Sequence, residues 1–247
     1  PIIEKGHAKN VANFSKLITV CKSFDKQYNP SKAAIKITNL EAQLTVYLQQ
    51  LQDIKDTAQA ETTARNNRKA GFKDYNKYST RLLGALKATD ASQEAINNAI
   101  STNKKIQGER ITDKPKAKTT TDGKEAEEDN TISTSQKSYT NIADHFKKFE
   151  TLLTSQAAVY TPNETELQIT SLNTYITNLD TLNQAVDTAE TAASNSRITR
   201  DHSFYDDKTG IVDLANAVKD YVKSVFNAGS PEHKLVTAIT FTKSPKK

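Results

Sequence analysis

Two pairs of arginines recur at one spacing, and paired arginines are suited to binding phosphate or carboxylate. The segments are RNNRKAGFKDY, residues 65–75, and RITRDHSFYDD, residues 197–207. The residues that match, 132 positions apart, are Arg65, Arg68, Phe72 and Asp74 in the first segment and Arg197, Arg200, Phe204 and Asp206 in the second. Arginines three residues apart share one face of a helix, and each guanidinium can bind an oxyanion through two parallel hydrogen bonds. One hypothesis is therefore a pair of anion-binding sites.

The same pattern also suits a packing role, which we favour. In that interpretation the arginines pair with groups on an adjacent helix while the phenylalanine anchors the next turn in the core. Lys69 and Lys73 would reinforce an anion site in the first segment, but Asp201 and Tyr205 occupy the equivalent positions of the second. A function common to both segments is therefore better explained by packing.

Metal and catalytic motifs are sparse. Glu4 and His7 have the Glu-x-x-His spacing of di-iron helical bundles, but such a site needs a second motif and two further carboxylates, and the aligned TSQKSYT supplies none. The sequence contains no Gly-x-Gly-x-x-Gly, no P-loop, no Gly-x-Ser-x-Gly and no His-Glu-x-x-His. We expect no metal, no cofactor and no enzymatic activity, with an enzyme of unrecognised site as an alternative.

The elements that would position these residues come from a duplication. Shifting the chain by 132 residues aligns positions 14–87 with 146–219 without a gap, and nineteen of the 74 pairs are identical. Each copy should then share one fold. We expect three long helices and a short fourth in each copy, the first near 8–28 and the second marked by an apolar stripe over 37–58 with alternating spacings of three and four.

The fourth helix of the second copy has a clear start signal. Ser230 is a good N-cap and Pro231 suits the first helical position. In the first copy SQEAINNAI, residues 92–100, should play the same part. The sequence therefore predicts an all-α fold of two tandem homologous antiparallel helical bundles, residues 1–110 and 139–247, joined by a polar flexible linker over 111–138.

Composition limits the classes of function. The net charge is +5 and the isoelectric point is about 9.0, with 15 basic and 9 acidic side chains in residues 1–100. This basic first half, with the lysines of the linker, makes nucleic-acid binding an alternative. The one cysteine, Cys21, excludes a disulfide within the chain, and its place on a helix face predicts burial. We see neither a leader segment nor an apolar run long enough to span a membrane, and expect a cytoplasmic protein.

The C-terminal part carries a resemblance. The stretch YVKSVFNAGSPEHKLVTAITFTK, residues 221–243, together with the Arg-x-x-Arg-x-x-x-Phe segment from residue 197, resembles an uncharacterised group of bacterial duplicated helical-bundle proteins. The resemblance implies an all-helical bundle and brings no activity with it. From the residues themselves we expect a non-catalytic scaffold, assembly subunit or protein-binding module, with a protein partner or self-association.

Overall fold

The protein is all-helical over the residues that the structure describes, 5–108 and 137–242 in a computed structural model. The helices form two compact units, and each is described on its own. Cys21 is fully buried and Ser230 caps the last helix by accepting a hydrogen bond from the His233 amide, so both predictions are confirmed. No helix among the described residues is long and apolar enough to cross a bilayer.

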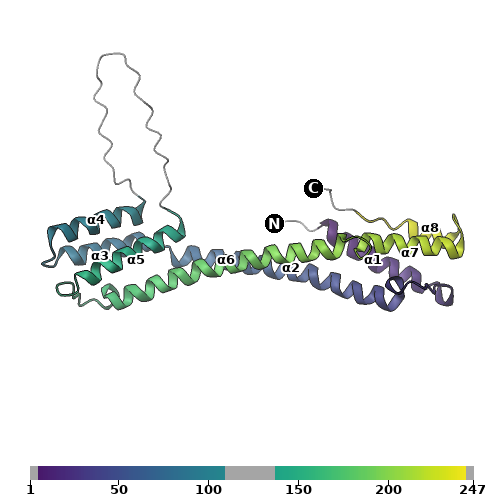
Figure 1. The fold of residues 1–247 in the computed structure, drawn as a ribbon, viewed down its shortest axis with the longest axis horizontal. Helices are drawn as coiled ribbons and strands as arrows, with labels where there is room; N and C mark the ends of the chain where they lie inside the picture. Colours follow the sequence, from purple (N-terminus) through teal and green to yellow (C-terminus); the bar gives the residue numbers. More distant parts are fainter. Residues whose placement is uncertain (1–4, 109–136, 243–247) are drawn as a thin grey trace, which may run out of the picture. The chain divides into compact units, whose positions relative to one another are not determined.

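Unit 1 combines residues 1–62 with residues 188–247. Its helices are α1 (Lys5–Lys22), the first part of α2 (Ile37–Gly71), the last part of α6 (Ile169–Tyr205), α7 (Ile211–Phe226) and α8 (Pro231–Thr237), with short 3-10 turns at Asp25–Gln27 and Ala33–Ile35. Figure 1 shows α7 alongside α1 and α8. Its core is aromatic at the centre, because the Tyr47 ring lies 5.5 Å from Phe14 and 5.0 Å from Phe204 between ring centroids.

Unit 2 comprises residues 63–187. It contains the end of α2, then α3 (Tyr75–Lys87), α4 (Gln93–Gln107), α5 (Tyr139–Ser155), a 3-10 turn η3 (Thr165–Leu167) and the first part of α6. Figure 1 shows α4 beside both α3 and α5. The apolar faces of these helices meet in one core that includes Leu82, Leu86, Phe146 and Phe149.

The division into units differs from the predicted division into 1–110 and 139–247. The physical reason lies in the two long helices. The segments 37–70 and 169–205 contain neither glycine nor proline, so nothing stops either helix after its apolar stripe. Each helix therefore continues through its Arg-x-x-Arg segment, and its last turns pack in the other unit. The predicted linker, residues 111–138, lies outside the described residues except for its last two positions.

The two copies share local detail at the predicted offset. The Tyr28 hydroxyl donates to the Ile35 carbonyl and the Tyr160 hydroxyl donates to the Leu167 carbonyl, each at 2.8 Å and each buried. In both places this bond closes the connection that precedes a long helix. The fourth helix of the first copy is not short, however, because α4 has 15 residues and α3 has 13.

Candidate functional site

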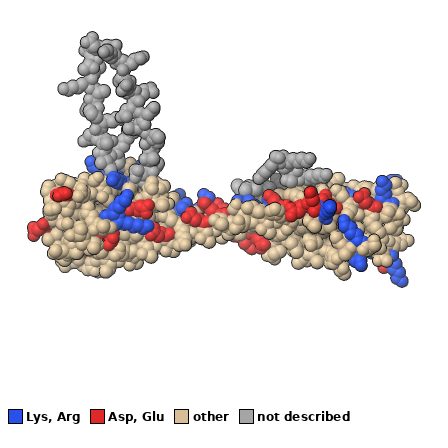
Figure 2. All heavy atoms as spheres, viewed as in Figure 1, with Lys and Arg blue, Asp and Glu red and all other residues tan. Residues whose placement is uncertain are grey.

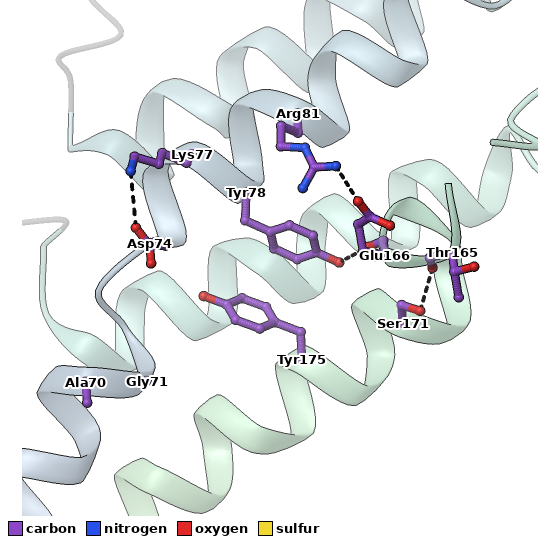
Figure 3. Close-up of a pocket in the computed structure, with 10 residues that line it drawn as sticks. All are labelled: Ala70, Gly71, Asp74, Lys77, Tyr78, Arg81, Thr165, Glu166, Ser171 and Tyr175. Atoms are coloured by element: carbon purple, nitrogen blue, oxygen red, sulfur yellow. Dashed lines mark hydrogen bonds and ion pairs between the residues drawn. The ribbon is translucent and has the colours of Figure 1, made fainter. Parts of the chain in front are cut away.

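The most developed surface feature of unit 2 is an open cleft of about 870 Å³. It lies between α3 on one side and η3 with the start of α6 on the other (Figure 3). The lining residues are Ala70, Gly71, Asp74, Lys77, Tyr78, Arg81, Thr165, Glu166, Ser171 and Tyr175. Aromatic rings, two cations and two carboxylates therefore share one hollow.

Helical spacing explains how α3 contributes its side of the cleft. The N-cap residue Asp74 is followed by Lys77, Tyr78 and Arg81 at steps of three, one and three, which places all four on one face of the helix. The opposite face carries buried apolar residues, among them Leu82 and Leu86. Burial of that face therefore fixes the direction in which the cleft-lining side chains project.

The other side of the cleft is held by hydrogen bonds from α3 to η3. The Arg81 guanidinium donates to a Glu166 carboxylate oxygen at 2.6 Å, and the Tyr78 hydroxyl donates to the Glu166 carbonyl at 2.8 Å. The Ser171 hydroxyl donates to the Thr165 carbonyl at 2.6 Å, which ties η3 to the first turns of α6. The Arg81 guanidinium also holds the pKa of Glu166 below its usual range. Glu166 is therefore a carboxylate at neutral pH.

Two tyrosines form the floor. The rings of Tyr78 and Tyr175 meet edge to face with centroids 4.7 Å apart, and Tyr175 also lies 5.3 Å from the buried ring of Phe146. Burial raises the pKa of Tyr175 to about 12, with smaller contributions from Tyr78 and from the Asp74 charge. Burial also raises the pKa of Tyr78. Both hydroxyls therefore keep their protons at neutral pH and can act as hydrogen-bond donors.

The two hydroxyls differ in what they do. The Tyr78 hydroxyl is engaged by Glu166, whereas the Tyr175 hydroxyl points the opposite way in Figure 3, and no hydrogen bond joins it to another residue that the structure describes. At that end of the cleft Lys77 and Asp74 form an exposed ion pair at 3.5 Å. The cleft thus offers a free phenolic donor beside one loosely paired cation and one loosely paired carboxylate.

The equivalent positions of unit 1 lack these side chains. At the offset of 132 residues, Tyr78 corresponds to Gly210, Arg81 to Asp213, Glu166 to Ala34 and Tyr175 to Gln43. The backbone differs as well, because α7 begins at Ile211, four residues later than the start of α3 would predict. The cleft is therefore a property of unit 2 and not a consequence of the fold that the copies share.

The four arginines singled out from the sequence do not meet in one site. Arg65 and Arg68 belong to unit 2, and Arg197 and Arg200 belong to unit 1. Arg65 is exposed, and the Arg68 guanidinium lies 4.5 Å from the centre of the Tyr139 ring. These two side chains belong to the last turns of α2, outside the cleft.

In unit 1 the arginines contact carboxylates. Arg197 lies 3.7 Å from a Glu61 carboxylate oxygen, and Arg200, which is only 6% exposed, donates from Nε and Nη2 to Asp201 at 2.9 and 2.7 Å. The phenylalanines that follow, Phe72 and Phe204, are both buried. These contacts favour the packing interpretation over an anion site, which nevertheless stays a prediction.

Sequence reasoning missed Tyr78, Arg81, Glu166 and Tyr175 because the comparison of the copies concentrated on identities. All four lie at positions where the copies differ. The signal that could have found them is the run Asp-x-x-Lys-Tyr-x-x-Arg from residue 74, which has the spacing of one helix face and no counterpart in the second copy.

Other chemistry is located as follows. Among the described residues, no group of three or more His, Cys, Asp or Glu side chains is placed to hold a metal ion. Glu4 lies outside the described residues, and His7 packs edge to face against Phe204 at 5.4 Å between ring centroids. Comparison with protein-family models, with curated proteins and with solved structures finds no match to this chain. The resemblance of residues 197–243 to bacterial helical proteins stays a prediction.

Proposed function

We propose that this protein is a non-catalytic helical scaffold that binds a protein partner, and that the cleft of unit 2 is the binding surface. The observation that carries the proposal is the gathering of Tyr78, Arg81 and Tyr175 in one open hollow. Tyrosine and arginine are enriched among the residues that dominate binding energy at protein interfaces. Tyrosine supplies a rigid ring and a polar hydroxyl together, which suits contact with a peptide backbone and its side chains.

The distribution of charge also favours a protein partner over a polyanion. On the face drawn in Figure 2, Lys and Arg side chains are interspersed with Asp and Glu and do not form a basic stripe. Within the cleft the two cations each have a carboxylate close by, at 3.5 Å for Lys77 and 2.6 Å for Arg81. A nucleic-acid site would instead present several unpaired cations along one surface.

The same proposal includes a duplicated origin for the scaffold. The shared offset of the 3-10 turns, of the starts of α2 and α6 and of the Tyr28 and Tyr160 hydrogen bonds supports one ancestral unit present twice. After duplication one unit gained the cleft side chains. Partner binding would then be the specialised role of unit 2, while unit 1 retains the common structural role.

The test is a selection followed by affinity measurements. A random peptide library displayed on phage is selected against the immobilised full chain, and recovered peptides are titrated by fluorescence anisotropy. Tyr175→Gln installs the side chain that unit 1 carries at Gln43, and Gln43→Ala is the matched control. Loss of an interface anchor costs about 2 kcal/mol or more, which raises Kd about 30-fold. We expect this loss for Tyr175→Gln and no change for the control.

Two further variants separate binding from folding. Tyr175→Phe keeps the ring and its packing on Phe146 while removing the free hydroxyl, and should weaken the peptides by less than Tyr175→Gln does. Arg81→Ala should weaken them with the circular dichroism spectrum unchanged. The proposal is wrong if peptides selected on the wild-type chain bind all three cleft variants with the wild-type Kd.

A further inference from the structure

Each hydrophobic core is built from both halves of the chain, here defined as residues 5–108 and 137–242. In unit 1 the first half supplies a run of core residues from Val11 to Tyr47, and the second half supplies a run from Phe204 to Ile239. In unit 2 the first half supplies residues between Phe72 and Ile106, and the second half supplies residues between Ile142 and Leu179. Neither half contains all of either core.

The two units make the same central contact with the halves exchanged. Phe204, at the end of α6, lies 5.4 Å from the ring of His7 near the start of α1. Phe72, at the end of α2, lies 4.8 Å from the ring of Tyr139 at the start of α5. The offset of 132 residues relates both members of each pair, since 72 corresponds to 204 and 7 to 139.

Polar contacts join the halves within unit 1 as well. The side chain of Asn10 both donates to the Thr242 carbonyl and accepts from the Thr242 amide, each at 2.9 Å. The Tyr221 hydroxyl accepts from the Asn29 amide at 3.0 Å. Paired hydrogen bonds of this kind fix the register of the two segments as well as their proximity.

The cleft of unit 2 is also composite. Tyr78 and Arg81 come from the first half, whereas Glu166 and Tyr175 come from the second. The bonds that shape the cleft, from Arg81 and Tyr78 to Glu166, run between the halves. A binding surface of this construction exists only when both halves are assembled.

We propose that the chain is a covalently joined, helix-exchanged pair of copies, in which each half is the folding partner of the other. The partner surface of each half is the apolar face of its first helix together with the face of the long helix that leads to its phenylalanine. A single copy of the repeat would fold only by pairing with a second copy, through the exchange of α2 and α6 seen here. This inference does not depend on which partner occupies the cleft.

Hydrogen exchange on the full chain tests the exchange directly. Phe204→Ala alters the second half, yet the contact it removes stabilises α1 of the first half. Truncating a fully buried phenylalanine lowers local stability enough to reduce amide protection about 100-fold or more. We expect this loss in α1 with α5 left protected, and the reverse for Phe72→Ala, which should expose α5 and leave α1 protected.

The opposite pattern would overturn the inference. If Phe204→Ala deprotects α5 and leaves α1 at wild-type protection, each half folds on itself. Should an alanine variant lose protection throughout the chain, Phe204→Leu and Phe72→Leu keep most of the apolar volume and give the milder form of the same test. With these variants, equal loss of protection in α1 and α5 would also contradict the exchange.

Discussion

The buried hydroxyl of Tyr160 gives a sharp test of how the cleft is held. It is 3% exposed as a residue and donates to the Leu167 carbonyl at 2.8 Å, which fixes the turn that carries Glu166. Tyr160→Phe removes the donor and leaves a buried carbonyl without it. A typical intramolecular hydrogen bond contributes about 1 kcal/mol net, and an orphaned buried acceptor costs about 1–3 kcal/mol. We therefore expect unit 2 to lose about 1–2 kcal/mol of stability.

The duplication provides the matched control. Tyr28→Phe removes the equivalent bond in unit 1, where the Tyr28 hydroxyl donates to the Ile35 carbonyl at the same 2.8 Å. Native-state hydrogen exchange measures the two units separately through amides of α5 and α1. Tyr160→Phe should lower protection in α5 about 10-fold and weaken the selected peptides, because Glu166 is held less firmly. Tyr28→Phe should lower protection in α1 without affecting the peptides.

The outcome that refutes this reasoning is specific. If Tyr160→Phe leaves protection of α5 within about 0.5 kcal/mol of wild type, the range of ordinary surface substitutions, the hydroxyl does not stabilise the turn. If both variants weaken the peptides equally, the binding surface is not confined to unit 2.

Three further outcomes follow from individual side chains. Burial raises the pKa of Tyr160 and of Tyr175 to about 12, so the folded chain holds these protons more tightly than the unfolded chain; the stability they confer should be complete below about pH 10 and decline as pH rises towards 12, which denaturant titrations at increasing pH would measure. Gly210→Ala should destabilise, because the added Cβ meets a backbone carbonyl oxygen at 2.6 Å, whereas Gly84→Ala, in an open position of α3, should stabilise by about 0.5–1 kcal/mol in thermal or urea unfolding. Burial raises the pKa of the Cys21 thiol to about 12, so its alkylation by iodoacetamide at pH 8 should be slow in the native protein and fast in urea.

Each of these has a contrary result. A flat stability profile between pH 10 and 12 would mean that the tyrosines are not buried in solution. Equal effects of the two glycine substitutions would show that the close approach at Gly210 is relieved at little cost. Native Cys21 reacting at the rate of the unfolded chain would place α1 away from its core.

The sequence predicted the class of fold and several local features because these depend on short-range patterns. Apolar spacings of three and four gave the helices, and the Ser230–Pro231 pair gave the start of α8. The pairing of the halves could not be predicted in the same way. Both copies carry the same apolar pattern, so a stripe on α2 can pack against either copy's first helix. The absence of a break between Ile37 and Gly71 was the available signal that the helix runs on.

The candidate site was hidden for a related reason. The repeated Arg-x-x-Arg-x-x-x-Phe segment drew attention because it is identical in both copies, and it contributes Phe72 and Phe204 to the two cores. Features shared by both copies report on the common fold. The cleft depends on what differs, above all Tyr175 against Gln43 and Arg81 against Asp213, together with the earlier start of α3.

The most direct test of the account is to cut the chain between its halves. A recognition sequence for a specific protease is inserted between residues 109 and 136, and the purified protein is cleaved to completion without denaturant. Size-exclusion chromatography with light scattering should then show both fragments eluting together at the mass of the intact chain, with the affinity for selected peptides unchanged. Fragments that elute separately, each with its own helical circular dichroism spectrum and its own cooperative melting, would contradict the claim that the two halves build each unit together.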